Sequence, residues 1–465
     1  MRHLKWVWVG FGLLCLAVVQ GTPVVPTGHA QTLPAEIIYT DNAGGLSRIA
    51  FDGQNFSAPV PFYVTNSPPA SYLLWPAPDG AHIAVVQRNY EGTTGIFSAR
   101  LLILTIPEGN EILNQPLLAA DFPANVPAEP GNPNREALDA VGAVAWAPDS
   151  QRLAFVSQHN GSTADIYLAD LSSGEVRNIE RESGAAALLT WSPDGKWLVY
   201  SDLVTFSAEA GYLSQGIYAL QFGPESIPRQ SKLDLAAAYP NDVHRVGWRD
   251  SETLLLAPRS FIAGAHGLYG WHLPTQTITP YLDERLETSV PVYSPASDMA
   301  AFTVPDLGAN TPLAEGFYLV PLASGDPTQV FAGTFLAVRP VGETAFLISG
   351  TYGDLLINSI TLEEAVLTAG DIATFVSPDQ RSITSYFGDS ILVGQIDAAE
   401  NHRLAVEDAL PPTWVPGTSL FVTAGTTEND AGLMAINTAT GDITQLDSNF
   451  ALAGQWIVVT TGNSN

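Results

Sequence analysis

The stretch Leu188-Leu-Thr-Trp-Ser-Pro-Asp-Gly-Lys-Trp-Leu-Val-Tyr200 decides the fold. It begins with a short apolar strand that ends at Trp191 and continues through a Pro-Asp-Gly turn into a second, alternating strand, 197–200. In such a turn proline fixes φ, aspartate bonds to its own backbone, and glycine tolerates a positive φ. The stretch therefore predicts a tight β-hairpin.

Copies of this hairpin recur along the chain, most clearly at 144–156 and 77–86. The proline, or the residue in its place, falls at positions 78, 148, 193, 250, 295, 340, 378 and 416. Apart from two longer intervals, this spacing is close to the roughly 40–45 residues of one four-stranded propeller blade. Trp146 and Trp191 end equivalent inner strands, so we expect both to be core residues that pack between blades and not ligand platforms.

The run Ser-Pro-Asp-Gly-Lys-Trp-Leu-Val-Tyr at 192–200, followed by Gly-Ile-Tyr-Ala-Leu at 216–220, resembles the PD40 (WD40-like) repeat of TolB-like propellers. The resemblance extends over residues 36–460 and is strongest around Pro148 and Pro193. It implies an all-β fold, a single β-propeller of four-stranded blades. The small N-terminal α/β domain of TolB has no counterpart in this chain.

The two ends of the repeat region look like parts of one blade. Residues 36–40 and 46–50 resemble the second and third strands of a unit that lacks its first strand, and 450–458 could supply that strand. A literal count is then nine blades. Because propellers typically have four to eight blades, we predict eight, within a range of seven to nine, and assign 31–465 to the propeller.

The composition limits the partners of the protein. It has 19 Lys and Arg against 47 Asp and Glu, for a formal net charge of −28. This excess argues against nucleic acid and against adsorption to an anionic membrane, since both need clustered cations. A cationic partner or metal ions would be electrostatically favoured, although the acidity is also explained by solubility alone.

The N-terminus predicts export. A basic start (Arg2, His3, Lys5) precedes the apolar run 6–19, which is short for a membrane span, and Gly28-His29-Ala30 offers a cleavage site. We assign 1–30 to a signal peptide; an uncleaved anchor is the alternative.

The only cysteine, Cys15, lies inside this signal, so the mature chain could form no disulfide. A secreted eukaryotic protein of this size would usually carry disulfides. We therefore expect a bacterial protein that is secreted or held in the cell envelope, with no stable membrane insertion after cleavage.

Strand counting places the irregular segments on one face. In a blade with strands a to d, the a–b and c–d loops share one face, and the b–c loops and d–a connections share the other. Insertions at 121–135, 204–214 and 305–315 fall on the b–c/d–a face, which we predict to be the binding face. Neutral loop variation is the alternative. Candidate binding residues on this face are Arg88, Tyr90, Glu91, His159, Asn160, Asp242, His244 and Asp306.

No complete catalytic motif occurs in the sequence. Gly-x-Ser-x-Gly, His-Glu-x-x-His and P-loop patterns are all missing. We therefore predict a non-catalytic scaffold, without cofactor or assigned metal, that binds a protein or an extracellular ligand. The alternative is a propeller enzyme that acts on a carbohydrate or lactone through a metal or acid/base site in the channel, for which Asp242 and His244 are the best candidates. Converging acidic and His side chains in the channel would favour the enzyme, and small or apolar ones the scaffold.

The export prediction can be checked by intact-mass measurement of the protein from its host. We expect the mature product to lack about 30 residues, because a signal peptide is removed during secretion. A full-length cytoplasmic product would contradict export.

Overall fold

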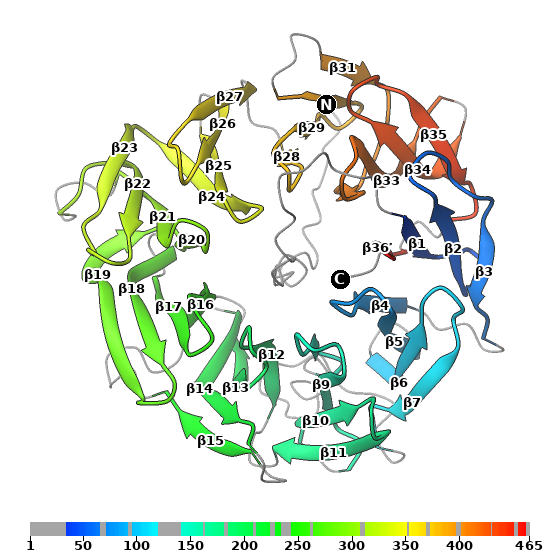
Figure 1. The fold of residues 1–465 in the computed structure, drawn as a ribbon, viewed down its shortest axis with the longest axis horizontal. Coiled ribbons are helices and arrows are strands. Elements are labelled where there is room, and N and C mark those ends of the chain that lie inside the picture. The colour runs from blue at the N-terminus through cyan, green and yellow to red at the C-terminus, as the bar shows by residue number, and fades with distance from the viewer. Residues whose placement is uncertain are drawn as a thin grey trace, which may run out of the picture.

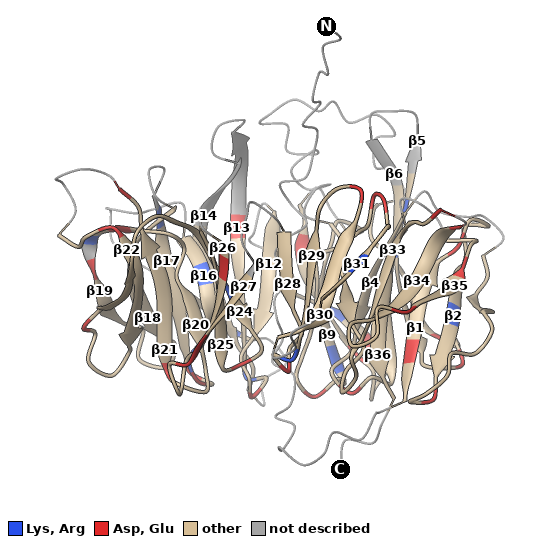
Figure 2. Cartoon of the chain, turned by 90° about the horizontal axis from the view of Figure 1, so that it is seen from above, with Lys and Arg blue, Asp and Glu red and all other residues tan. Residues whose placement is uncertain are grey.

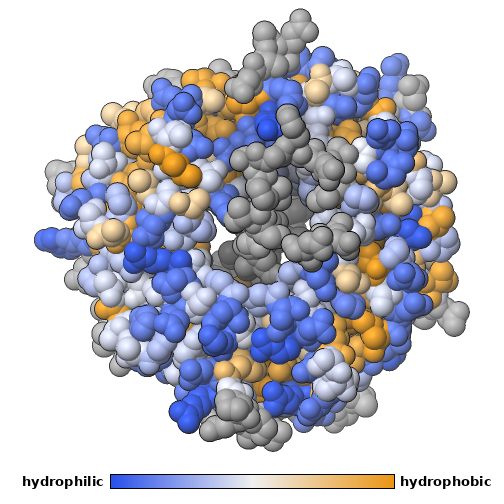
Figure 3. All heavy atoms as spheres, in the orientation of Figure 1, coloured by the Kyte–Doolittle hydropathy of each residue, from blue (hydrophilic) through white to orange (hydrophobic). Residues whose placement is uncertain are grey.

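The computed structural model describes residues 34–65, 71–91, 95–119, 141–160, 163–180, 185–207, 211–223, 228–233, 243–260, 264–306, 312–350, 353–368, 373–396, 401–428, 430–450 and 454–461. In these ranges the secondary structure is entirely strand, turn and bridge. The strands form nine four-stranded antiparallel sheets, which stand side by side around a central hollow (Figures 1 and 3). The predicted all-β propeller is confirmed, with nine blades instead of the preferred eight.

Every blade is given from its inner to its outer strand. Blade one is β36 (Trp456–Thr460), β1 (Ala35–Thr40), β2 (Leu46–Phe51) and β3 (Val60–Tyr63). Blade two is β4 (Ser71–Pro76), β5 (His82–Glu91), β6 (Gly95–Thr105) and β7 (Glu111–Pro116), and blade three is β8 (Val144–Trp146), β9 (Arg152–Ser157), β10 (Asp165–Asp170) and β11 (Glu175–Glu180). Blade four is β12 (Ala186–Trp191), β13 (Trp197–Ser207), β14 (Gly211–Gln221) and β15 (Arg229–Lys232). Blade five is β16 (Val243–Trp248), β17 (Thr253–Ser260), β18 (Gly264–His272) and β19 (Thr277–Thr288). Blade six is β20 (Val292–Ser294), β21 (Met299–Val304), β22 (Gly316–Pro321) and β23 (Thr328–Ala332), and blade seven is β24 (Phe335–Val341), β25 (Ala345–Gly350), β26 (Gly353–Asn358) and β27 (Glu364–Thr368). Blade eight is β28 (Ala373–Val376), β29 (Ser382–Tyr386), β30 (Ile391–Gln395) and β31 (Asn401–Leu404). Blade nine is β32 (Thr413–Trp414), β33 (Leu420–Thr426), β34 (Ala431–Asn437) and β35 (Ile443–Asp447).

The middle strands of a blade are buried on both faces, because each blade packs against two neighbours. In β10 the five residues from Asp165 to Ala169 are buried, whereas the outer strand β7 has no buried residue. This explains why the middle strands read as nearly continuous apolar runs while the outer strands are polar.

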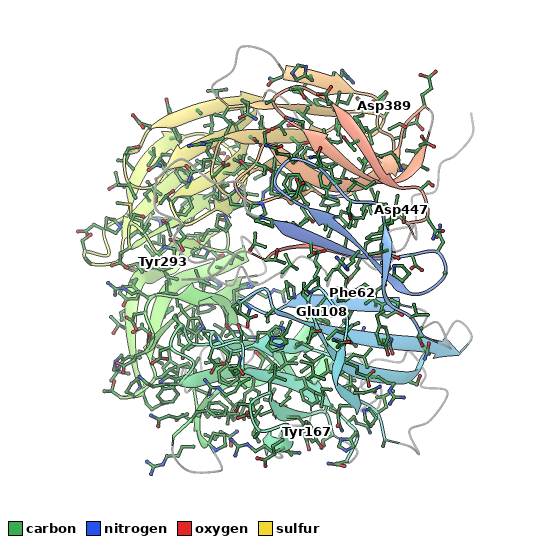
Figure 4. The ribbon with its side chains drawn as sticks, turned by 45° about the vertical axis from the view of Figure 1, so that its right-hand side comes forward. Phe62, Glu108, Tyr167, Tyr293, Asp389 and Asp447 are labelled. Carbon is green, nitrogen blue, oxygen red and sulfur yellow. The ribbon has the colours of Figure 1, made fainter. Side chains whose placement is uncertain are left out.

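Blade one contains both ends of the repeat region. β36 pairs with β1 from Trp456 opposite Tyr39 to Thr460 opposite Ala35. The Tyr39 hydroxyl donates a hydrogen bond of 2.6 Å to Asp447 of blade nine, a residue labelled in Figure 4. The ring is thus closed by main-chain pairing within blade one and by a buried hydroxyl between blades one and nine.

The Pro-Asp-Gly turns have the structural role expected of them. Asp79 accepts from the Ala81 N–H at 2.9 Å, and Gly80 has a φ of +68°. A Cβ on Gly80 would lie 2.3 Å from the Thr460 carbonyl oxygen, so only glycine lets this turn approach the closing strand. The Asp79 N–H also donates to the Ser150 hydroxyl of the next turn at 3.0 Å, which links neighbouring blades.

The tryptophans that end the inner strands bond each blade to the one before it. Trp146 and Trp191 are 2% and 6% exposed, which confirms that they are core residues. The Trp146 indole N–H donates to the Trp75 carbonyl at 3.0 Å, and that of Trp191 donates to the Ala145 carbonyl at 3.0 Å. Trp248 continues the series with a 3.2 Å bond to the Thr190 hydroxyl.

One predicted loop is largely a strand extension. Residues 204–207 and 211–214, expected in a b–c insertion, continue β13 and β14, and the Tyr212 backbone lies opposite Phe206. Extending the ladder provides hydrogen bonds for backbone groups that an irregular loop would have to bond elsewhere.

Closure by β36 has a direct test. Deleting 449–465 should leave the inner edge of β1 unpaired and cause aggregation, because exposed strand edges recruit other chains. Light scattering and thermal melting would follow the change. A truncated protein that stays monomeric with an unchanged melting curve would rule out closure by this strand.

The Trp191→Ala variant should lose about 3–5 kcal/mol of unfolding free energy, as truncation of a large buried aromatic does. Trp191→Phe keeps a buried ring but removes the N–H that Ala145 accepts, so it should lose about 0.5–1.5 kcal/mol. Denaturant titration gives both values. A freely quenchable Trp191 whose truncation is nearly neutral would contradict the packing role.

Candidate functional site

The b–c/d–a face carries the predicted binding residues. Strands β5 and β13 run towards this face, the upper edge of the ring in Figure 2. The insertion 121–135 is outside the described residues. The site is therefore built from the ends of β5 and β9 and from the segment that leads into β8.

Arg88 lies near the b–c end of β5 and reaches across to blade three. Its Nη2 donates to the Val141 carbonyl at 2.8 Å. Its Nε is buried and has no hydrogen-bond partner among the described residues. The bond to Val141 thus holds the guanidinium in position, while its buried Nε–H donates no hydrogen bond to any residue that the structure describes.

Gln158 and His159 follow directly after β9. The Gln158 backbone N–H bonds to the Leu117 carbonyl at 2.8 Å, and its side chain is buried, with the residue 5% exposed. Gln158 Oε1 and His159 Nδ1 are both buried without a partner in the described part of the chain. The His159 ring lies 5.4 Å from that of Tyr167, labelled in Figure 4.

The segment 141–142, which leads into β8, contacts both β5 and β9. Val141 accepts from Arg88, and the Gly142 N–H donates to the Val156 carbonyl at 3.0 Å, two residues before Gln158. A Cβ on Gly142 would lie 3.2 Å from Arg88 Nη2, so glycine leaves room for the guanidinium. We call Arg88, Gln158 and His159 the d–a cluster. It offers a cationic donor, an amide acceptor and an imidazole nitrogen.

The other candidates lie elsewhere on this face. Tyr90 and Glu91 end β5, and their side chains are outside the description, as is Asp242. Asn160 is exposed next to His159. His244 lies in β16 of blade five, opposite Ala257, and Asp306 is exposed after β21 of blade six. Of the predicted residues, Arg88 contacts the segment 141–142, and His159 lies three residues after Val156, which bonds to Gly142 of that segment.

Sequence reasoning missed Gln158. A glutamine at the end of a strand carries no signal of burial, and its neighbour His159 was singled out only for its loop position. Within the described ranges, no three His, Cys, Asp or Glu residues lie close enough together to hold a metal ion. No helix among them is long and apolar enough to cross a membrane.

The inner strands, which border the central hollow, expose apolar side chains. Leu188 of β12 is 47% exposed and Leu336 of β24 is 64% exposed, and a β-bulge interrupts the pairing at each. Arg245 of β16 donates to the Leu188 carbonyl and, at 3.5 Å, to the Ser201 hydroxyl. Burial lowers the pKa of this guanidinium, because it is desolvated among neutral acceptors.

Comparison with known proteins agrees with this architecture. No protein-family model matches the chain. Among curated proteins it is similar to Tol-Pal system protein TolB of Alcanivorax borkumensis, 31% identical over 137 residues, which is 29% of each chain. It is also similar to the uncharacterized peptidase YuxL of Bacillus subtilis, 36% identical over 14% of this chain and 9% of that protein. Tricorn protease homolog 1 of Streptomyces coelicolor is 43% identical over 14% of this chain and 6% of its own length.

A solved structure described as that of the eukaryotic initiation factor superimposes with a TM-score of 0.59 at 12% identity, covering 91% of this chain and 98% of that one. Such a likeness supports the fold alone. The protein is a nine-bladed β-propeller. Its repeats are of the TolB/PD40-like type, and it spans less than a third of the length of each curated relative that it matches.

Proposed function

We propose that the protein is an extracytoplasmic, non-catalytic scaffold that binds a protein or extracellular ligand on the b–c/d–a face, with the d–a cluster as its anchor. The observation that carries this proposal is the set of buried, unpartnered atoms Arg88 Nε, Gln158 Oε1 and His159 Nδ1. A buried polar atom without a partner costs free energy, and a bound partner that supplies the missing hydrogen bonds would recover it.

The channel wall supports a scaffold over an enzyme. Its inner strands expose the apolar side chains of Leu188 and Leu336, the kind of lining expected of a scaffold. The enzyme hypothesis rests on Asp242 and His244, of which only His244 belongs to the described residues. It stays a prediction.

Charge favours a cationic partner. With a net charge of −28, the protein should steer positively charged surfaces towards itself, so that association slows as salt increases. The signal-like sequence 1–30 supports an encounter outside the cytoplasm.

The test is affinity capture from a cell-envelope extract of the host, followed by binding measurements on the captured partner. Arg88→Gln and Gln158→Ala should each weaken binding about tenfold, the equivalent of one charge-assisted hydrogen bond. Lys196→Gln is the matched control, because Lys196 lies in the Pro-Asp-Gly turn of the opposite face and is paired with Asp194 at 2.8 Å.

Shortening 121–135 or 204–214 should also weaken binding. If these variants bind fully while a folded Lys196→Gln protein does not, the binding face is the opposite one.

A further inference from the structure

The c–d turn of blade seven has a leucine at a position where four other blades have glycine. In blades two, three, six and nine the same turn position is a glycine with positive φ: Gly109, Gly174, Gly325 and Gly441, at +71° to +75°. Each donates its backbone N–H to the carbonyl four residues earlier. Glycine is expected there, because a side chain at positive φ is strained.

Blade seven has Leu362 at this position. Its φ is +59°, and its N–H bonds to the Asn358 carbonyl at 2.9 Å, the same bond that the glycines make. Asn358 Oδ1 accepts from the N–H groups of Ile360 and Thr361, as Asp170 of blade three does from Ser172 and Ser173. The turn is therefore the same, and only the strained residue differs.

Leu362 gains no burial in return for this strain. It is 52% exposed, and its neighbours Ile360 and Val366 are 58% and 76% exposed. Apolar surface gathers over blade seven in Figure 3. A bulky residue held at positive φ and left in solvent stabilises neither the turn nor the core, and strain of this kind is typical of functional positions. We call Ile360, Leu362 and Val366 the blade-seven patch.

The charged residues between the members of the patch are both acidic. Glu363 and Glu364 are exposed between its members. From 340 to 380 the sequence has no Lys or Arg. An apolar patch among carboxylates is complementary to a surface that presents apolar side chains next to Lys or Arg, and it disfavours a second acidic copy of this chain.

We propose that the blade-seven patch is a docking surface for a protein segment whose apolar side chains are flanked by basic residues, with Leu362 as the anchor. This surface is separate from the d–a cluster, because c–d turns lie on the opposite face. Binding there does not depend on the scaffold function proposed above.

The experiment uses three labelled synthetic peptides and fluorescence anisotropy with the full chain. One peptide alternates Leu and Val with Lys, the second replaces Lys by Glu, and the third replaces Leu and Val by Ser and Thr. We expect saturable, salt-sensitive binding of the first peptide only. No saturable binding of it, or equal binding of the other two, would overturn the proposal.

The decisive variant is Leu362→Gly, which restores the residue of the equivalent turns. It should lower the affinity for the apolar, basic peptide about tenfold or more, as truncation of an interface anchor does. At the same time its melting temperature should stay equal or rise, because glycine relieves the strained φ. A marked loss of stability, or unchanged affinity, would overturn the proposal by making Leu362 a structural residue or a bystander.

Gln276→Gly is the matched control. Gln276 holds a φ of +56° in the corresponding turn of blade five, so glycine relieves strain there without removing an apolar side chain. Peptide binding should be unchanged. Light scattering at increasing concentration provides the last check, since a dimer that Leu362→Gly dissolves would make a second copy the occupant and contradict the proposed partner.

Discussion

The pairing of β36 with β1 is the constraint on which the ring depends. It joins residues more than 400 positions apart in the chain, and the same junction holds the bond from Tyr39 to Asp447. Without it, blade one would lack its inner strand, and the inner edge of β1 would be open. Closing a loop of this length costs conformational entropy of the chain. A ring in which every blade packs on two neighbours can offset this entropy cost, because both faces of each sheet are then buried.

Successive blades are joined by two further kinds of bond. Between the inner strands, the indole N–H groups of Trp146, Trp191 and Trp248 donate hydrogen bonds to the inner strand of the preceding blade. On the a–b face the turns bond to one another, as Asp79 does to Ser150. In blades five and six the same place is taken by the ion pair of Arg249 with Asp298, which raises the pKa of Arg249 through its hydrogen bonds to that carboxylate. The chain thus keeps a fixed geometry while the residues that provide it change.

Both proposed surfaces are places where this regularity fails. The d–a cluster leaves buried polar atoms without partners, and the blade-seven patch keeps a leucine where four other blades have glycine. Each carries an energetic penalty that the fold itself does not need. Because the two lie on opposite faces, one propeller could hold two partners at once, which suits a scaffold.

The sequence by itself determined the repeat, its turn chemistry, the core role of Trp146 and Trp191, and the face on which Arg88 and His159 lie. These follow from local rules: proline, aspartate and glycine act within a few residues, and strand order alternates the faces. The preference for eight blades failed because each of the eight anchors marks a whole blade, and the composite blade adds one more. Only the tertiary structure decided that Gln158 is buried, with its backbone bonded to Leu117 of the preceding blade, and that Leu362 takes the conformation of a glycine without the burial of a core residue. Burial and unmet hydrogen bonds depend on neighbours contributed by other blades, and no local pattern records them.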